Sequence, residues 1–207
     1  MKFSILRHPD SDLRCLALSR DDQHSASASD NGTIIVHSLR TGIVEYRADN
    51  VFARGVLGLC YLPNGSGLVA CGYDDIGSNN LKVLSPSLKL VQNLVGHDGY
   101  AECVTVSPSG SHIASGGFDK KVIIWSEPGE GGEWARVQVL EDHTGVVRTV
   151  CFSPDGKQLA TASYKSIKLY SFNEGIAILA HTLEGHTNAV RSLSFSPDCK
   201  LLCSGSN

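Results

Sequence analysis

GHDGYAECVTVSPSGSHIASGGFDKKVIIW, residues 96–125, is the stretch that decides the fold of this chain. It contains a Gly-His start, an alternating apolar segment, a Ser-Pro-Ser-Gly turn, a second short segment, a turn with an aspartate and a third apolar segment. Alternation with period two is expected of a strand with one buried face, and Pro and Gly favour tight turns. The stretch therefore predicts three antiparallel strands joined by short turns.

The same pattern recurs along the chain. DHTGVVRTVCFSPDGKQLATAS and GHTNAVRSLSFSPDCKLLCSGS align with the first stretch, and their histidines, His97, His143 and His186, are 46 and 43 residues apart. Two weaker copies precede them. Self-similarity at such a period indicates a repeat architecture. The predicted repeats are approximately 8–50, 51–95, 96–141, 142–184 and 185–207.

Each complete copy contains four short apolar segments and no helical periodicity of useful length. Four short strands bury both faces only when such sheets stack on one another. We therefore predict an all-β fold, a β-propeller of four-stranded antiparallel blades, with 1–207 as a single partial domain. The fifth copy supplies two strands, so we interpret the chain as an incomplete propeller or a fragment of a seven-bladed ring. A five-bladed ring closed by residues 2–6 and completion by another chain are the alternatives.

Composition narrows the function classes. The net charge is -3 without a run of like charges, which argues against nucleic acid as a direct partner. The seven cysteines lie mostly in strand-like runs without metal-ligand spacing, so we interpret them as structural thiols of a reducing compartment. No apolar run approaches the length of a membrane span. We expect an intracellular protein, cytoplasmic or nuclear or both, with no membrane insertion, metal or cofactor.

The Gly-His starts and the tryptophan that ends the third segment of residues 96–125 resemble the WD-repeat family. In that family a buried network joins an aspartate, the histidine, a serine or threonine and the tryptophan, and both histidine nitrogens need partners. The resemblance implies this structural network at His97, Ser115, Asp119 and Trp125; at His143, Thr161 and Tyr170; and at His186 and Ser204. Lys165 stands where the fourth copy would have its aspartate, so we expect that network to be incomplete. The second copy has Phe52, Ala70, Asp74 and Leu84 and looks largely apolar.

The resemblance also implies a rigid, non-catalytic scaffold that binds peptides or proteins within multiprotein complexes. The family's contact positions lie shortly after the histidine and just before the turn aspartate. Here they are Tyr100, Glu102, Phe118, Val146, Arg148, Tyr164, Ala189 and Arg191. Exposed aromatic residues and arginine are enriched in binding hot spots. The alternative interpretation is that these are ordinary loop residues.

Two other function classes remain as hypotheses. The net negative charge of the chain argues against a chromatin or nucleic-acid module. A propeller enzyme would need a nucleophile and a base outside the repeated network, and no such pair is evident, so we expect no catalytic residues. The Ser, His and Asp of the network recur once per repeat beside a tryptophan, which indicates a structural role rather than a catalytic triad.

Overall fold

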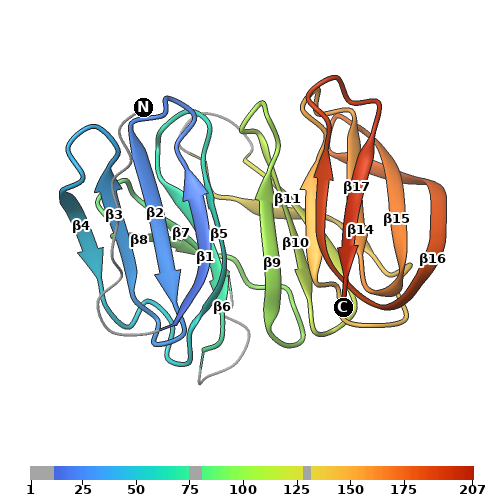
Figure 1. Cartoon of the computed structure of the whole chain (residues 1–207), viewed down its shortest axis with the longest axis horizontal. Coiled ribbons are helices and arrows are strands. Elements are labelled where there is room, and N and C mark those ends of the chain that lie inside the picture. Colours follow the sequence, from blue (N-terminus) through green and yellow to red (C-terminus); the bar gives the residue numbers. More distant parts are fainter. Residues whose placement is uncertain (1–11, 75–80, 128–131) are drawn as a thin grey trace. The chain divides into compact units, whose positions relative to one another are not determined.

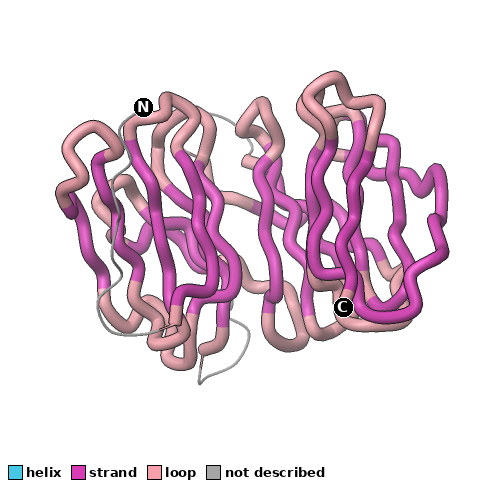
Figure 2. The backbone as a smooth tube through the Cα atoms, viewed as in Figure 1, coloured by secondary structure: helices cyan, strands magenta, loops and turns pink. Residues whose placement is uncertain are grey.

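The computed structural model describes residues 12–74, 81–127 and 132–207. Within these ranges every regular element is a β-strand and none is a helix (Figures 1 and 2). This confirms the all-β prediction. The chain forms two compact units, Met1–Val95 and Gly96–Asn207, which meet at the predicted boundary between the second and third repeats. The segment 2–6, invoked above for a five-bladed ring, lies outside the described residues.

Unit one, Met1–Val95, contains two four-stranded antiparallel sheets in which neighbouring strands follow one another in the sequence. The strands of the first sheet are β1 (Leu13–Leu18), β2 (His24–Ser29), β3 (Ile34–Ser38) and β4 (Val44–Ala48). Those of the second sheet are β5 (Val56–Tyr61), β6 (Leu68–Gly72), β7 (Leu81–Leu84) and β8 (Leu90–Asn93). Each sheet is thus an up-and-down unit of the kind that a propeller blade requires.

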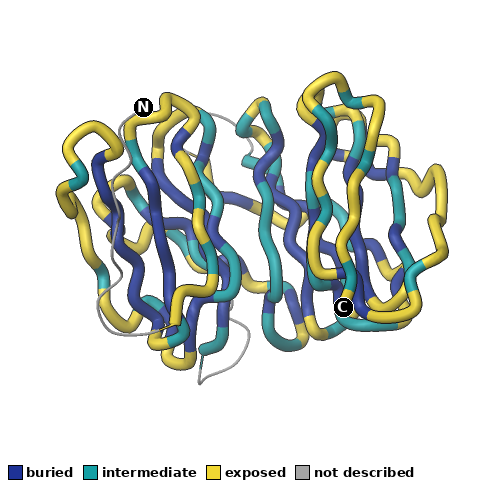
Figure 3. The backbone as a smooth tube through the Cα atoms, viewed as in Figure 1, coloured by how far each residue is buried: buried dark blue, intermediate teal, exposed yellow. Residues whose placement is uncertain are grey.

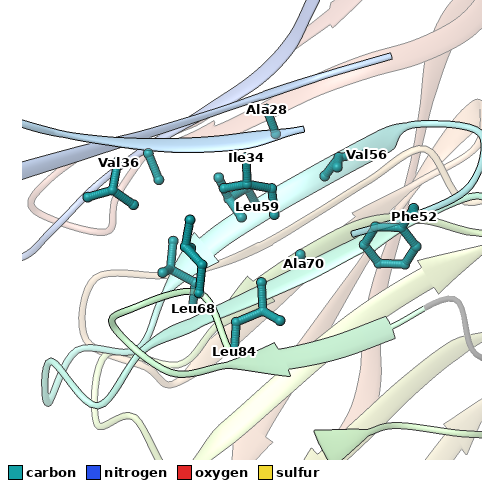
Figure 4. Packing of buried hydrophobic residues seen from close by; sticks show 11 residues of the cluster. Ala28, Ile34, Val36, Phe52, Val56, Leu59, Leu68, Ala70 and Leu84 are labelled. Carbon is teal, nitrogen blue, oxygen red and sulfur yellow. The ribbon is translucent and has the colours of Figure 1, made fainter. Parts of the chain in front are cut away.

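The two middle strands of the first sheet are buried, whereas its outer strands are mostly exposed (Figure 3). The core of unit one lies between its two sheets. Ala28, Ile34 and Val36 of the first sheet belong to one buried cluster with Leu59 and Leu68 of the second (Figure 4). Because neither sheet can bury both faces alone, this shared cluster stabilises both.

Unit two, Gly96–Asn207, contains a third four-stranded sheet and a five-stranded sheet. The third sheet has β9 (Ala101–Val106), β10 (His112–Gly117), β11 (Val122–Ser126) and β12 (Ala135–Leu140). The five-stranded sheet has β13 (Thr149–Phe152), β14 (Gln158–Ala162), β15 (Tyr164–Asn173), β16 (Ile176–Phe195) and β17 (Leu202–Ser206). A buried cluster again joins the two sheets, with Ile124 from one and Leu159 and Tyr170 from the other.

Strand β16 differs from the expected pattern. The sequence predicts a boundary between two repeats at residues 184 and 185, with a short strand in each, but Ile176–Phe195 is one strand of 20 residues. Its first part pairs with β15 and its last part, Val190–Phe195, pairs with β17. Gly185 has a φ of 145°, which glycine adopts without a Cβ clash. The predicted boundary between the fourth and fifth repeats therefore falls inside a strand that changes partners.

Candidate functional site

A buried polar network connects the Gly-His start of the stretch 96–125 with β10, the turn that follows it and β11. His97 Nδ1 lies 3.0 Å from Asp119 Oδ1, and His97 Nε2 lies 2.8 Å from Ser115 Oγ. The Trp125 indole N–H donates to the same Ser115 hydroxyl oxygen at 3.0 Å. His97 and Trp125 are 3% and 2% exposed. Both ring nitrogens of the buried histidine are thus partnered, which removes the penalty for burying a polar side chain.

Two glycines make room for this network. A Cβ on Gly96 would lie 2.8 Å from Trp125 Cη2, and one on Gly117 would lie 2.5 Å from His97 Nδ1. Glycine therefore precedes the histidine at the start of this repeat because a larger residue would collide with Trp125. Burial raises the pKa of the Asp119 carboxyl, but hydrogen bonding and the charge of His97, with the N–H groups of Asp98 and Lys121, outweigh it and leave that pKa lowered. Asp119 is accordingly held as an anion.

The fourth copy has a different network from the one expected. His143 Nε2 lies 2.7 Å from Thr161 Oγ1, and its Nδ1 lies 3.1 Å from Ser163 Oγ. The sequence predicts an incomplete network here because Lys165 stands in place of the aspartate. The aspartate is indeed missing from the network, and the hydroxyl of Ser163 lies beside Nδ1 in its place. The Tyr170 hydroxyl donates to Asp142 Oδ2 at 3.0 Å. Burial lowers the pKa of His143 to about 4, with a further lowering from Lys168 and an opposing effect of Asp142.

In the fifth copy, His186 Nε2 lies 2.8 Å from Ser204 Oγ. This contact repeats the pairing of His97 with Ser115, but at an exposed position. The same local motif thus occurs once buried and once exposed.

The second copy replaces the histidine network with a lysine. Lys82 Nζ donates to Asp74 Oδ2 at 2.8 Å and to the Val51 carbonyl at 2.6 Å, and it lies 4.4 Å from the centroid of the Phe52 ring. The side chains of Lys82 and Asp74 are 14% and 24% exposed. The copy that looked largely apolar therefore holds an ion pair and a cation–π contact at the corresponding place. Lys82 carries no family motif, so sequence reasoning missed it.

Replacing Lys82 by methionine is expected to destabilise unit one by about 2 kcal/mol, because the Asp74 carboxylate loses its ammonium partner while the side-chain volume is kept. Lys89→Met, at an exposed lysine of the same unit, should change stability by less than about 0.5 kcal/mol. Hydrogen exchange of the β6 and β7 amides, measured by mass spectrometry, compares the two variants. Equal protection in both would show that the Lys82 ion pair contributes nothing to stability.

The predicted partner-binding residues of the third and fourth copies lie close together in unit two. The Phe118 N–H donates to the Tyr100 carbonyl at 2.8 Å. Arg148 Nη1 lies 3.9 Å from Glu102 Oε2 and so links the two copies. Phe118 and Tyr164 are 57% and 53% exposed. Two exposed aromatic side chains thus stand in these copies, Phe118 in the turn after β10 and Tyr164 at the start of β15.

The remaining predicted positions are more varied. Ala189, which pairs with Tyr164, is 8% exposed, so its side chain offers little surface. Val146 is half-buried, and Arg191 is exposed on β16. Lys165 Nζ lies 5.0 Å from the centroid of the Tyr164 ring, a cation beside this surface that sequence reasoning did not include. We call Phe118, Tyr164, Arg148 and Glu102 the loop face.

Other chemistry has little support in the part of the chain that the structure describes. There, no group of three or more His, Cys, Asp or Glu side chains could hold a metal ion. No helix among the described residues is long and apolar enough to cross a membrane. All seven cysteines are free thiols, and burial raises the pKa of Cys15 to about 12.

Successive four-stranded antiparallel sheets that share buried clusters define an all-β repeat protein with blade-like units. The chain belongs to the WD40 family, described as "WD domain, G-beta repeat", whose profile matches residues 2–38, 88–126, 134–171 and 178–207. The stretch 39–87 is not among the matched residues, and it contains the first three strands of the second sheet, with Lys82 in place of the histidine network.

Two curated relatives share parts of the chain. This chain is 36% identical over 113 residues to the small ribosomal subunit protein RACK1 of Drosophila melanogaster. The aligned segment covers 53% of this chain and 33% of that protein. This chain is also 43% identical over 83 residues to the probable cytosolic iron-sulfur protein assembly protein 1 of Sclerotinia sclerotiorum. Here the aligned segment covers 38% of this chain and 18% of that protein. The aligned segments thus span a third or less of these relatives.

Proposed function

We propose that this chain is a non-catalytic scaffold that binds protein or peptide partners through the loop face. The observation that carries the proposal is the exposure of Phe118 and Tyr164, 57% and 53%, in the two copies that the Arg148–Glu102 contact links. Large exposed aromatic side chains beside arginine are the composition enriched in binding hot spots. Membership of the WD40 family supports the same class of function.

The geometry of Arg148 suggests the chemistry of the partner. Its guanidinium lies 3.9 Å from Glu102, at the outer limit of an ion pair, and the Arg148 side chain is 29% exposed. A partner carboxylate could accept two parallel N–H bonds from the guanidinium at a shorter distance. Lys165 beside Tyr164 adds a second cation. We therefore propose an acidic peptide segment with an apolar side chain as the preferred ligand.

The cellular setting follows as part of the same proposal. The two relatives are named as a ribosomal subunit protein and a cytosolic assembly protein, which supports work inside the cell within a multiprotein complex. The seven free thiols agree with a reducing compartment. We propose a cytoplasmic location, with the nucleus as the alternative, and we propose that the predicted repeats belong to one propeller domain.

The loop face is tested by alanine substitution. Phe118→Ala and Tyr164→Ala are each expected to weaken binding of the partner by about 2 kcal/mol, which is roughly a thirtyfold increase in Kd. Neither substitution should lower the melting temperature of the chain. Ile178→Ala is the matched control, because Ile178 is 66% exposed on β16 and belongs to no predicted contact position. Affinity is measured by titrating the immobilised full chain with a partner identified by cross-linking. If the partner binds all three variants as tightly as the unsubstituted chain, the binding surface lies outside the loop face.

A further inference from the structure

The turns between the first and second strands of the five repeats share one acceptor position. In three of them it is an aspartate, and a serine two residues earlier donates to its Oδ1. These bonds are Ser19 to Asp21 at 2.5 Å, Ser153 to Asp155 at 2.6 Å and Ser196 to Asp198 at 2.6 Å. The backbone N–H two residues after each aspartate donates to the same oxygen, at 3.0 to 3.2 Å. In the second copy, Asn64 Oδ1 accepts from the N–H of Ser66 at 3.0 Å.

An anion is favoured at this position. The pKa values of the Asp155 and Asp198 carboxyls are lowered, first by the serine hydrogen bond and then by the backbone N–H. These donors stabilise the charged form of the acceptor. The turn therefore works as a small anion cradle in the first, fourth and fifth copies.

The third copy has Ser109 at the same place. Ser107 Oγ lies 3.0 Å and Ser111 Oγ 2.7 Å from Ser109 Oγ, and the Ser111 N–H donates to it at 3.4 Å. The serine and backbone groups of the cradle thus surround this position as well, but it holds a neutral hydroxyl, and in each serine pair either hydroxyl can be the donor. Of the five turns, this one alone has neither a carboxylate nor a carboxamide at the acceptor position.

Ser109 is also accessible. Its side chain is exposed at the tip of the β9–β10 turn and lines an open pocket of about 310 Å³. Lys157 lines the same pocket and makes no ion pair with another described residue, whereas Asp155 and Glu174 contribute carboxylates there. An anion on Ser109 would therefore find a cation within the same pocket.

We propose that Ser109 is a phosphorylation site whose phosphate fills the acceptor position that aspartate occupies in the other copies. In the reaction, Ser109 Oγ attacks the terminal phosphorus of a nucleoside triphosphate held by a protein kinase. The new O–P bond forms as the bond from that phosphorus to its bridging oxygen breaks and the nucleoside diphosphate leaves. The hydroxyl proton passes to the base of the kinase.

The product would use the donors already present. The terminal phosphate oxygens reach one bond further than an aspartate carboxylate and accept from the hydroxyls of Ser107 and Ser111. The added charge, about -1.5 to -2 at neutral pH, lies in the pocket of Lys157. Phosphorylation should therefore stabilise the turn and make this rim of unit two more negative, independently of the loop face.

The first experiment incorporates phosphoserine at position 109 of the full chain during synthesis. The denaturation midpoint of unit two, followed by tryptophan fluorescence, should shift upward, and Ser109→Asp should shift it in the same direction. Phosphoserine at position 171 is the control, because Ser171 is exposed on β15 of the same unit and lies outside these turns. A downward shift with phosphoserine 109 would refute the cradle.

The second experiment tests whether the modification occurs. The full chain is incubated with labelled adenosine triphosphate and an extract of the cells that produce it, and the phosphopeptides are mapped by mass spectrometry. The phosphate is expected on Ser109, and Ser109→Ala should lose most of the label while Ser171→Ala keeps it. A map of the unsubstituted chain without phosphate on Ser109 would overturn the proposal, and this result does not depend on the folding of any variant.

Discussion

Replacing His97 by alanine is expected to lower the free energy of unfolding of unit two by about 3 to 5 kcal/mol, since one substitution breaks a buried charged contact and removes a partner of Ser115. The Asp119 side chain is 4% exposed in the intact contact and would remain as an anion with two backbone donors. The same change also leaves a cavity in place of the imidazole. The effect should therefore be among the largest that a single polar residue of this chain can produce.

The matched control is His186→Ala. His186 Nε2 makes the same 2.8 Å contact to a serine hydroxyl as His97 does, but at an exposed position. Its loss should cost less than about 1 kcal/mol, because water replaces the partner. Guanidinium unfolding followed by fluorescence reports unit two, since both tryptophans, Trp125 and Trp134, lie there. Equal midpoints for the two variants would show that the His97 network is not a stability determinant.

Acidification is expected to destabilise unit two through His143. The pKa of His143 falls from 6.5 to about 4 in the folded chain, chiefly because burial disfavours the charged imidazole. The unfolded chain therefore binds more protons than the folded chain between pH 6.5 and pH 4, and stability rises with pH in this window. The contribution is fully present above pH 6.5 and is lost as the pH falls to about 4, a change of about 3 kcal/mol.

His143→Gln isolates this contribution, because glutamine can still hydrogen-bond near Thr161 and Ser163 but does not titrate. Unfolding free energies of the two chains are measured at intervals from pH 7.5 to pH 4. The difference between them should shrink as the pH falls, whereas carboxylates such as Asp119 affect both chains alike. A constant difference across the window would mean that His143 does not change its protonation on unfolding.

Much of the fold could be predicted because its signals are local. The alternation of Val104 and Val106, the Ser-Pro-Asp-Gly turns and the period of about 44 residues follow from strand geometry and turn chemistry, which involve near neighbours in the sequence. The positions of His97, Ser115, Asp119 and Trp125 could be predicted for the same reason, since a repeated motif keeps each residue at a fixed place in its sheet. The structure places these four side chains within hydrogen-bond distance.

The partners in the degraded copies could not be predicted. Lys82 and Ser163 satisfy polar needs that the family motif assigns to other residues, and neither has a signal in its own segment. The same holds for β16, where a segment predicted as two short strands of adjacent repeats forms one strand that changes partners. These outcomes depend on which side chains and backbone groups meet across separate strands.

The sequence by itself therefore determined most of the strands and turns, the repeat and the resemblance to the family, because each depends on patterns among residues close in the chain. The tertiary structure alone decided how each buried polar group is satisfied: Asp119 in one repeat, Ser163 in the next and Lys82 with Asp74 in another. A buried donor or acceptor must find some partner, but several residue types can meet that requirement. The choice among them is made only when the strands have packed.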